Sequence, residues 1–417
     1  MNLGDRRKLA TLLLAGVSAL AITACGSSSS GGAGSGGGTT ALEKGAPLNI
    51  LSIGDTTGPL KLYGEEHLHG LEAAVAYYNS KGGIDGHELV VTHQSSNGDP
   101  TTATSVLVKE MSADPGKYTM VDAGAEAAEA AALIPTLKRY PVLGLALSDA
   151  SEQCATDAES ECPNFFGLEG TLTLPETAAA DFMKSKGLKK VGILEEAIDF
   201  TESETGPMEA ALEKDGIDVT TVSYPESSVD LTSQVSQLKG AGVEGIFVEA
   251  LGAPVGYAVK ARAKLGWQVP IVFDIAGSAA DITKLAPVQY LKDETYQDIY
   301  TSVSPPTPFE GVEEMKKFFP GGKFGEVPNN TPGKGWDEIV VLASAIEQAE
   351  GSTSPQDLIK ALNEPDAATK SNPLYVTARE IGWSPENHEN NFMSSEDFRV
   401  VPVGPLVEGE IVPFGQE

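Results

Sequence analysis

The residues of this sequence that could do chemistry are its histidines and its paired carboxylates. His67 and His69 lie beside Glu65 and Glu66, and no other part of the sequence gathers metal-binding side chains so closely. Two positions apart on a helix, the two imidazoles point in different directions, so one regular turn cannot bring both to a single metal ion. We therefore interpret this segment as the solvated start of a helix and expect no metal site and no cofactor.

Motifs of hydrolases and nucleotide-binding enzymes are absent from the sequence. It contains no Gly-x-Ser-x-Gly, no His-Glu-x-x-His and no Gly-x-x-x-x-Gly-Lys-Ser/Thr, and residues 333–335 (Gly-Lys-Gly) lack the spacing and the hydroxyl of the last. Acidic pairs such as Glu195 with Glu196, or Asp199 with Glu202, could serve acid–base catalysis. With 59 acidic residues in the chain such pairs arise from composition, so we expect solvated faces there and no enzyme.

The composition is that of an acidic globular protein. The 417 residues include 29 basic and 59 acidic side chains, which give a formal net charge of −30 at pH 7. Phosphate backbones and anionic lipid surfaces would repel such a chain, which excludes a general nucleic-acid binder. With 41% hydrophobic and 21% charged residues the chain is expected to fold, and its length suits two or three domains.

Residues 1–24 have the pattern of an export signal. A basic start at residues 6–8 (Arg-Arg-Lys) precedes an apolar run over 9–23, which is shorter than the about 20 residues that a membrane span needs. The run ends in Ile-Thr-Ala-Cys, which resembles the lipobox of bacterial lipoproteins and implies that Cys25 is lipidated. A soluble secreted protein with an unmodified Cys25 is the alternative. The arginine pair leaves open whether export follows the Sec or the twin-arginine route.

Residues 25–46 continue from this cysteine as a stretch rich in glycine and serine, which we expect to be a flexible tether. Cys154 and Cys162 are the other two cysteines, and they lie close together in a polar segment that we interpret as a loop. An oxidising compartment outside the cytoplasmic membrane favours a disulfide between them. Two free thiols or a metal pair are the alternatives, although no further metal ligand is visible near by in the sequence.

From residue 47 onward, short apolar runs alternate with stretches of helical spacing. This alternation predicts parallel sheets covered by helices, and two successive series predict two doubly wound α/β halves. We expect strands over 48–53, 89–93, 118–122, 142–147, 190–194, 218–224, 245–248, 269–273 and 296–303. We expect helices over 65–80, 101–111, 125–138, 175–186, 202–214, 231–240, 254–265, 336–350 and 355–362. The segment 377–391 reads as an irregular connector, and 398–403 with 406–412 as a hairpin turning at Gly404-Pro405.

Three motifs at the start of this region carry glycine, aspartate and proline at characteristic places. They are Gly-Asp-Thr-Thr-Gly-Pro at 54–59, Gly-Gly-Ile-Asp-Gly at 82–86 and Gly-Asp-Pro at 98–100. With these motifs the chain resembles the type I periplasmic binding proteins, most closely the Leu/Ile/Val-binding branch of the solute receptors of ABC importers. The resemblance implies an α/β fold of two doubly wound, parallel-sheet lobes joined by a three-crossing hinge. Lobe 1 would span 47–168 plus 304–390, and lobe 2 would span 169–303 plus 391–417.

The resemblance also implies which residues of lobe 1 would contact a solute. The loop after the third strand carries Ala125 and Glu126 where amino-acid receptors of the family carry hydroxyls, and Glu126 would repel a ligand carboxylate. The loop after the fourth strand offers Ser148 and Asp149. Tyr63 is the aromatic contact expected near the start of the first helix. The structural alternatives are core packing for Tyr63 and helix capping or solvation for Glu126 and Asp149.

On lobe 2 the resemblance implies contacts from three further residues. Phe200 aligns with the family's aromatic that covers the ligand, although core packing is the alternative, and Leu251 replaces a second aromatic. Asp274 stands two positions before Ala276, where the family carries the acid that holds the ligand ammonium. Because one buried carboxylate decides whether an ammonium is accepted, this departure argues against a plain α-amino acid as ligand.

The sequence as a whole predicts an exported receptor, lipid-anchored to the outer face of a bacterial cell membrane. We expect it to capture a small polar solute, such as an amino acid, an amide or a related metabolite, and to pass it to ABC permease and ATPase subunits. We expect a monomer that meets the membrane only through its lipid and binds no nucleic acid. A ligand-sensing receptor of the same fold with a signalling partner is the alternative, and an exported hydrolase is a less favoured one.

Overall fold

The structure is a computed structural model that describes residues 41–416 with short gaps. The gaps are 59, 147–151, 171–172, 251, 276–281, 304–308, 323, 325–327 and 329. Cys25, the predicted signal and most of the predicted tether lie outside the described residues. No described helix combines the length and the apolar character that crossing a bilayer requires.

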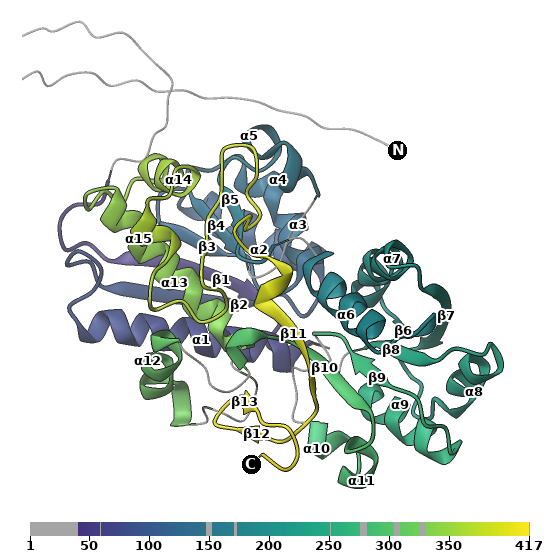
Figure 1. Ribbon diagram of the computed structural model, residues 1–417. Coiled ribbons are helices and arrows are strands. Elements are labelled where there is room, and N and C mark those ends of the chain that lie inside the picture. The colour runs from purple at the N-terminus through teal and green to yellow at the C-terminus, as the bar shows by residue number, and fades with distance from the viewer. Residues whose placement is uncertain are drawn as a thin grey trace, which may run out of the picture. The chain divides into compact units, whose positions relative to one another are not determined.

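The first sheet is parallel and contains the first five strands of the chain. Its strand order is β2-β1-β3-β4-β5 (Figure 1). The strands are β1 (Leu48–Gly54), β2 (Leu89–Ser95), β3 (Met120–Asp122), β4 (Leu143–Ala146) and β5 (Phe165–Gly167). Helices cover both faces, which explains why most of these strands are continuous apolar runs, and the four strands predicted here are confirmed.

Four helices form the two layers on this sheet. They are α1 (Lys61–Ser80), α2 (Pro100–Ala113), α3 (Ala127–Leu137) and α13 (Asn330–Gln348). Leu71 of α1 and Trp336 of α13 share one core with Leu48, and α2 and α3 form the core on the opposite face. Asp99 begins α2 by accepting a hydrogen bond from the backbone N–H of Thr101, as expected of an N-cap before proline.

The second sheet has six strands in the order β11-β10-β9-β8-β6-β7. They are β6 (Lys190–Ala197), β7 (Asp218–Pro225), β8 (Gly245–Glu249), β9 (Ile271–Phe273), β10 (Thr295–Tyr300) and β11 (Phe398–Pro402). All neighbours are parallel except β11, which runs antiparallel to β10. The helices on its faces are α6 (Thr173–Ser185) and α7 (Asp199–Lys214), and α8 (Thr232–Gly240) and α9 (Ala253–Lys264).

The chain returns to the first sheet after β10 and then leaves it again. The returning helices are α12 (Glu310–Phe318), α13, α14 (Pro355–Asn363) and α15 (Ala367–Lys370). Residues of α12, α13 and α14 belong to the same core as Leu48 and Ile50 of β1. Since β11 then joins the second sheet, the chain passes three times between the elements of the two sheets (Figure 1).

Helix α13 begins earlier than its apolar spacing predicts. Its first turns contain Pro332 and two glycines, a composition that favours a loop. Helix α13 packs so closely on α1 that only glycine fits at the contact. A Cβ on Gly335 would lie 2.1 Å from the carbonyl oxygen of His67. In the same contact a Cβ on Gly70 of α1 would lie 1.7 Å from the carbonyl oxygen of Pro332. Tertiary packing therefore overrides local propensity here.

The predicted hairpin at the C-terminus is wrong in its pairing. Strand β11 pairs with β10, whereas β12 (Leu406–Val407) pairs with β13 (Glu410–Ile411). The tight turn lies at Glu408 and Gly409, which both have positive φ, 52° and 82°, as a two-residue hairpin turn requires. The predicted irregular connector at 377–391 is confirmed and contains no helix or named strand.

Candidate functional site

A buried lysine at the start of α13 lies between a residue that follows the first sheet and a residue of the second sheet. Lys334 is 3% exposed, and its Nζ contacts Oε1 of Glu169, which follows β5. The same Nζ lies 4.7 Å from the ring centre of Tyr300, at the end of β10. In the sequence this lysine stands out only as part of an incomplete nucleotide-binding motif, which gives no sign of its contact with Glu169.

Tyr63 lies on the first turn of α1, partly buried, in the field of this lysine. Burial raises the pKa of its hydroxyl; the ammonium of Lys334 opposes this shift, and the carboxylates of Glu169, Glu126 and Glu204 reinforce it. The hydroxyl therefore stays neutral and can both donate and accept a hydrogen bond. The charges around Tyr63 come from both series of elements, since Glu126 precedes α3 and Glu204 lies on α7.

Ala125 and Glu126 lie directly before α3. Ala125 is buried, and Gly124 before it has a φ of 81° and would place a Cβ 2.5 Å from the carbonyl oxygen of Ile53. Glu126 occupies the N-cap position, but its side chain makes no capping hydrogen bond, so the predicted capping role is wrong. Burial, with the carboxylates of Glu129 and Asp55, raises its pKa to about 8. At pH 7 this side chain is mostly protonated, which weakens the predicted repulsion of a ligand carboxylate.

The predicted contacts of the other loops are described only in part. Ser148, Asp149 and Leu251 lie outside the described residues. Phe200 is the second residue of α7, and its side chain is not among those described. Asp274 directly follows β9 and is 4% exposed, and its backbone N–H donates to the carbonyl oxygen of Val248 at 3.2 Å, which extends the ladder between β9 and β8.

Asp274 belongs to a row of acidic residues across the second sheet. Glu195 of β6 lies opposite Glu249 of β8 in the parallel register. Val248 lies opposite Phe273 and Phe273 opposite Gln297, so the next positions are Glu249, Asp274 and Asp298 on three neighbouring strands. Residues at equal register share one face of a sheet, and this face packs against α6 and α7. The four exposures are 8%, 1%, 4% and 1%.

The expectation that Glu195 and Glu196 lie on a solvated face is therefore wrong. Both are buried, because they end a strand whose two faces are covered by helices. Composition says nothing of which acidic residues become neighbours, whereas the register of parallel strands brings the carboxyl ends of the strands, and the acidic residues there, together. Acidic residues that end successive apolar runs were the signal that could have found this row, since ligands of such sheets bind at the strands' carboxyl ends.

A second buried polar cluster lies at the end of β3 and involves His67. The imidazole is 2% exposed, so the predicted solvated helix start is wrong. Its Nε2 lies 3.2 Å from Oδ1 of Asp122 and 3.5 Å from Oε1 of Glu338 on α13. Burial opposes ionisation of Asp122, but His67 and the N–H of Gly124, which donates at 2.7 Å, hold its pKa below the usual value. Burial and the Asp122 charge raise the pKa of Glu338 well above its usual value.

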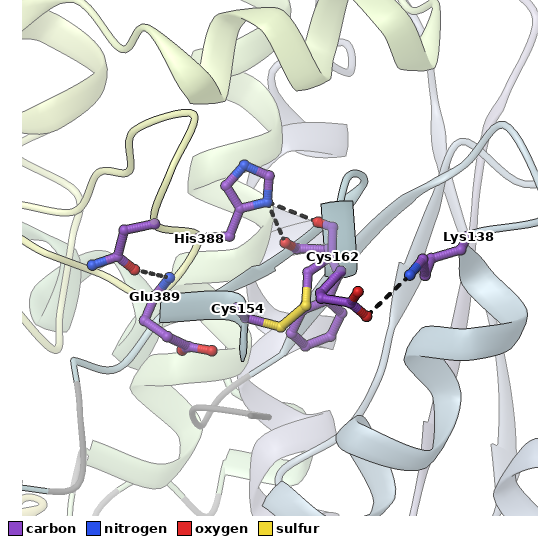
Figure 2. Close-up of a disulfide and its surroundings, with 8 residues drawn as sticks. Lys138, Cys154, Cys162, His388 and Glu389 are labelled. Carbon is purple, nitrogen blue, oxygen red and sulfur yellow. Dashed lines mark hydrogen bonds and ion pairs between the residues drawn. A yellow bond between two sulfur atoms is a disulfide. The ribbon is translucent and has the colours of Figure 1, made fainter. Parts of the chain in front are cut away.

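The predicted disulfide between Cys154 and Cys162 is present (Figure 2), with the two Cα atoms 5.4 Å apart. The segment is not the loop expected from sequence but two short helices, α4 (Glu152–Thr156) and α5 (Ala158–Glu161). The backbone N–H of His388 donates to the carbonyl oxygen of Cys154 at 2.8 Å, and its Nδ1 lies 2.8 Å from that of Cys162. The disulfide therefore anchors the irregular connector 377–391.

Comparison with known proteins agrees with this architecture. A model of the family described as periplasmic binding protein matches residues 47–397. The Leu/Ile/Val-binding protein homolog 7 of Brucella abortus is 24% identical over 298 residues, which are 68% of this chain and 73% of that protein.

Solved structures share the fold at low sequence identity. A type 1 periplasmic binding protein from Bordetella pertussis has a TM-score of 0.72 at 20% identity, covering 88% of this chain and all of that one, 100%. The substrate-binding protein LivJ from Streptococcus pneumoniae, in complex with isoleucine, has a TM-score of 0.69 at 16% identity, with coverages of 85% and 99%. A solute-binding protein from Rhodopseudomonas palustris with 4-hydroxybenzoate has a TM-score of 0.69 at 17% identity, with coverages of 88% and 95%. With the family model matching most of its length and the type I fold in place, this chain belongs to the periplasmic binding protein family of solute receptors.

Proposed function

We propose that this protein is the receptor of an ABC importer, exported and lipid-anchored through Cys25 to the outer face of a bacterial cell membrane. It acts as a monomer and delivers its solute to permease and ATPase subunits. Its two lobes are 47–168 plus 304–390 and 169–303 plus 391–417, and the solute is held between them. Family membership supports the receptor role, and the export signal and lipobox in the sequence support the anchor.

The observation that carries the proposal is the environment of Tyr63. The ammonium of Lys334 and the carboxyl groups of Glu126 and Glu204, from elements of both proposed lobes, act on the neutral hydroxyl of Tyr63. Such a mixed set can pair with a solute that carries both donors and acceptors, as an amino acid or an amide does. A solute that contacts both lobes stabilises the closed arrangement over the open one, which is how binding would be reported to a permease.

A ligand screen with one variant tests the proposal. Thermal shift followed by isothermal titration over amino acids, amides, ureas, small amines and aromatic acids should identify a solute. Tyr63→Phe removes one hydroxyl and should weaken binding of that solute by about tenfold, the cost of a lost buried hydrogen bond of about 1 to 1.5 kcal/mol. Tyr140→Phe, which removes a hydroxyl near Ser112 at the far end of α3, is the matched control and should bind normally.

Two results would contradict the proposal. A complete screen in which no solute binds the folded protein would remove the receptor role. A solute that binds Tyr63→Phe and Tyr140→Phe equally well would keep the role but displace the site from Tyr63.

A further inference from the structure

Six buried carboxyl groups gather at the carboxyl end of the second sheet. Four belong to the row on the strands, and two come from the helices that cover the same face. The helix residues are Glu176 of α6 and Glu204 of α7, each 5% exposed. Oxygens of Glu204, Glu249 and Asp274 all lie within 4.8 Å of one another. We call these six residues (Glu176, Glu195, Glu204, Glu249, Asp274 and Asp298) the acidic cluster. Its three central carboxyl groups come from α7, from β8 and from the residue after β9.

The strongest charges that act on Glu249, at the centre of the acidic cluster, are those of other carboxyl groups. Besides burial, the strongest influences on Glu249 are the carboxylates of Asp274, Glu204, Glu176 and Glu195, and they raise its pKa well above the usual value. Lys334, a buried lysine at the start of α13, contacts Glu169, which is not part of the acidic cluster. Burying several like charges without a counter-ion costs several kcal/mol per ion, on the order of the stability of a whole domain.

Three oxygens of the acidic cluster lack a hydrogen-bond partner within the described part of the chain. They are Oε2 of Glu249, Oε2 of Glu176 and Oδ1 of Asp298, on side chains that are more than nine-tenths buried. The hydroxyl of Tyr224, also buried without a partner among these residues, lies in the field of Glu196, Asp274 and Glu249. Since native proteins satisfy nearly all buried polar atoms, this set of free acceptors indicates a ligand that supplies positive charge.

We propose that the acidic cluster binds a hard divalent cation, with Glu204, Glu249 and Asp274 as its central ligands and Glu176 and Asp298 beside them. Ca²⁺ binds oxygen ligands at about 2.3–2.6 Å, so two ligands on opposite sides of one ion lie about 5 Å apart. The 4.8 Å limit on the three central oxygens fits this separation. Ligands that are all carboxylates favour Ca²⁺, Mn²⁺ or Mg²⁺ over zinc, which prefers nitrogen and sulfur.

The ion site shares Glu204 with the proposed solute site, but ion binding can be measured without any solute. The purified full-length protein is stripped with chelator and titrated calorimetrically with Ca²⁺, Mn²⁺ and Mg²⁺. We expect one ion per chain and a higher melting temperature with the ion bound. Terbium luminescence excited through tyrosine gives a second readout, because Tyr224 and Tyr300 lie on strands of the same sheet.

Two single substitutions locate the ion, with one control. Glu249→Gln and Asp274→Asn each remove one charged ligand and should weaken the ion's affinity by about tenfold or more, because ligand charge sets affinity in such sites. Glu226→Gln removes the same charge from the exposed segment after β7 and should leave the affinity unchanged. If a variant fails to fold, the ion titration and the terbium signal of the unsubstituted protein still decide whether a site exists.

Three results would overturn the proposal. The folded, stripped protein could bind none of the three ions. The ions could bind with equal affinity to Glu249→Gln and Glu226→Gln, which would place them on the acidic surface. Spermidine could bind where the metal ions do not, which would make the acidic cluster a site for an organic polycation. A failed solute screen with intact ion binding, or the reverse, separates this proposal from the proposed function.

Discussion

The two sheets bury carboxyl groups at corresponding places, at the carboxyl ends of their strands, but they treat the charge differently. In the first sheet, His67 and the N–H of Gly124 contact Asp122, and burial raises the pKa of the neighbouring Glu338 well above its usual value. In the second sheet, the strongest charges around Glu249 are all carboxylates. The first cluster joins α1, β3 and α13 and pairs a carboxylate with an imidazole, although Oδ2 of Asp122 and both carboxyl oxygens of Glu338 have no hydrogen-bond partner among the described residues. The acidic cluster has only carboxyl groups at its centre, and in our proposal a cation from outside supplies the positive charge.

The largest effect that this comparison predicts is at Asp122. Asp122→Ala removes the acceptor that contacts both His67 and the N–H of Gly124 inside a buried cluster. Breaking a buried pair from one side costs about 3–5 kcal/mol, and we expect a loss of unfolding free energy of that size in chemical denaturation. Asp122→Asn keeps an oxygen acceptor and should cost clearly less. Equal losses for the two variants would show that volume, not the polar contacts, makes this joint stable.

In the second sheet we expect a substitution to raise the unfolding free energy rather than lower it. In chelator, Glu249→Gln should raise the unfolding free energy at neutral pH, because it removes one of several mutually repelling groups. The folded-state pKa of Glu249 lies above its ordinary value of 4.5, so the folded state holds a proton that the unfolded state has already released. The stability of the unsubstituted protein is therefore lost as pH rises from about 4.5 toward the raised pKa, and the variant should show a flatter profile.

Denaturation curves at pH 4.5, 6 and 7.5 measure this difference, and addition of Ca²⁺ should reverse its sign at pH 7.5. Parallel pH profiles for the variant and the unsubstituted protein would mean that Glu249 does not carry the repulsion. Together with the result at Asp122, the two signs would distinguish a closed polar cluster from one that lacks its counter-ion.

The sequence was sufficient to predict the strands of the two sheets except β5, because apolar runs such as those of β1 and β8 are local patterns. It was not sufficient for α13, whose first turns are rich in glycine because α1 lies so close that a Cβ on Gly335 would meet the backbone of His67. It also missed both buried clusters. His67 is conspicuous in sequence only for its neighbours on the same helix, and Glu249 is not conspicuous at all. Only the α1–α13 contact and the parallel register bring their partners to them. Signals that arise from tertiary neighbours cannot be read from spacing along one element.

The smallest predicted effect is at Glu126. Like Glu249, this residue has a raised pKa and carboxylate neighbours, but its side chain is less buried. Its pKa of about 8 comes from burial and from the carboxylates of Glu129 and Asp55, but its side chain is only partly buried, so solvent screens the effect. The raised folded-state pKa means that stability falls as pH rises from about 4.5 to about 8. Glu126→Gln should remove part of this slope and raise the melting temperature at pH 8 more than at pH 5.

Glu88→Gln, at an exposed position before β2, changes the net charge equally and is the control for Glu126→Gln. The same variant addresses the site. If the protonated Glu126 is what allows a solute carboxylate near α3, the unsubstituted protein should lose affinity for such a solute between pH 7 and pH 9, and Glu126→Gln should not. An affinity that falls equally in both proteins would move the titrating group elsewhere. It would also mean that the loop before α3 does not determine which solute charge is accepted.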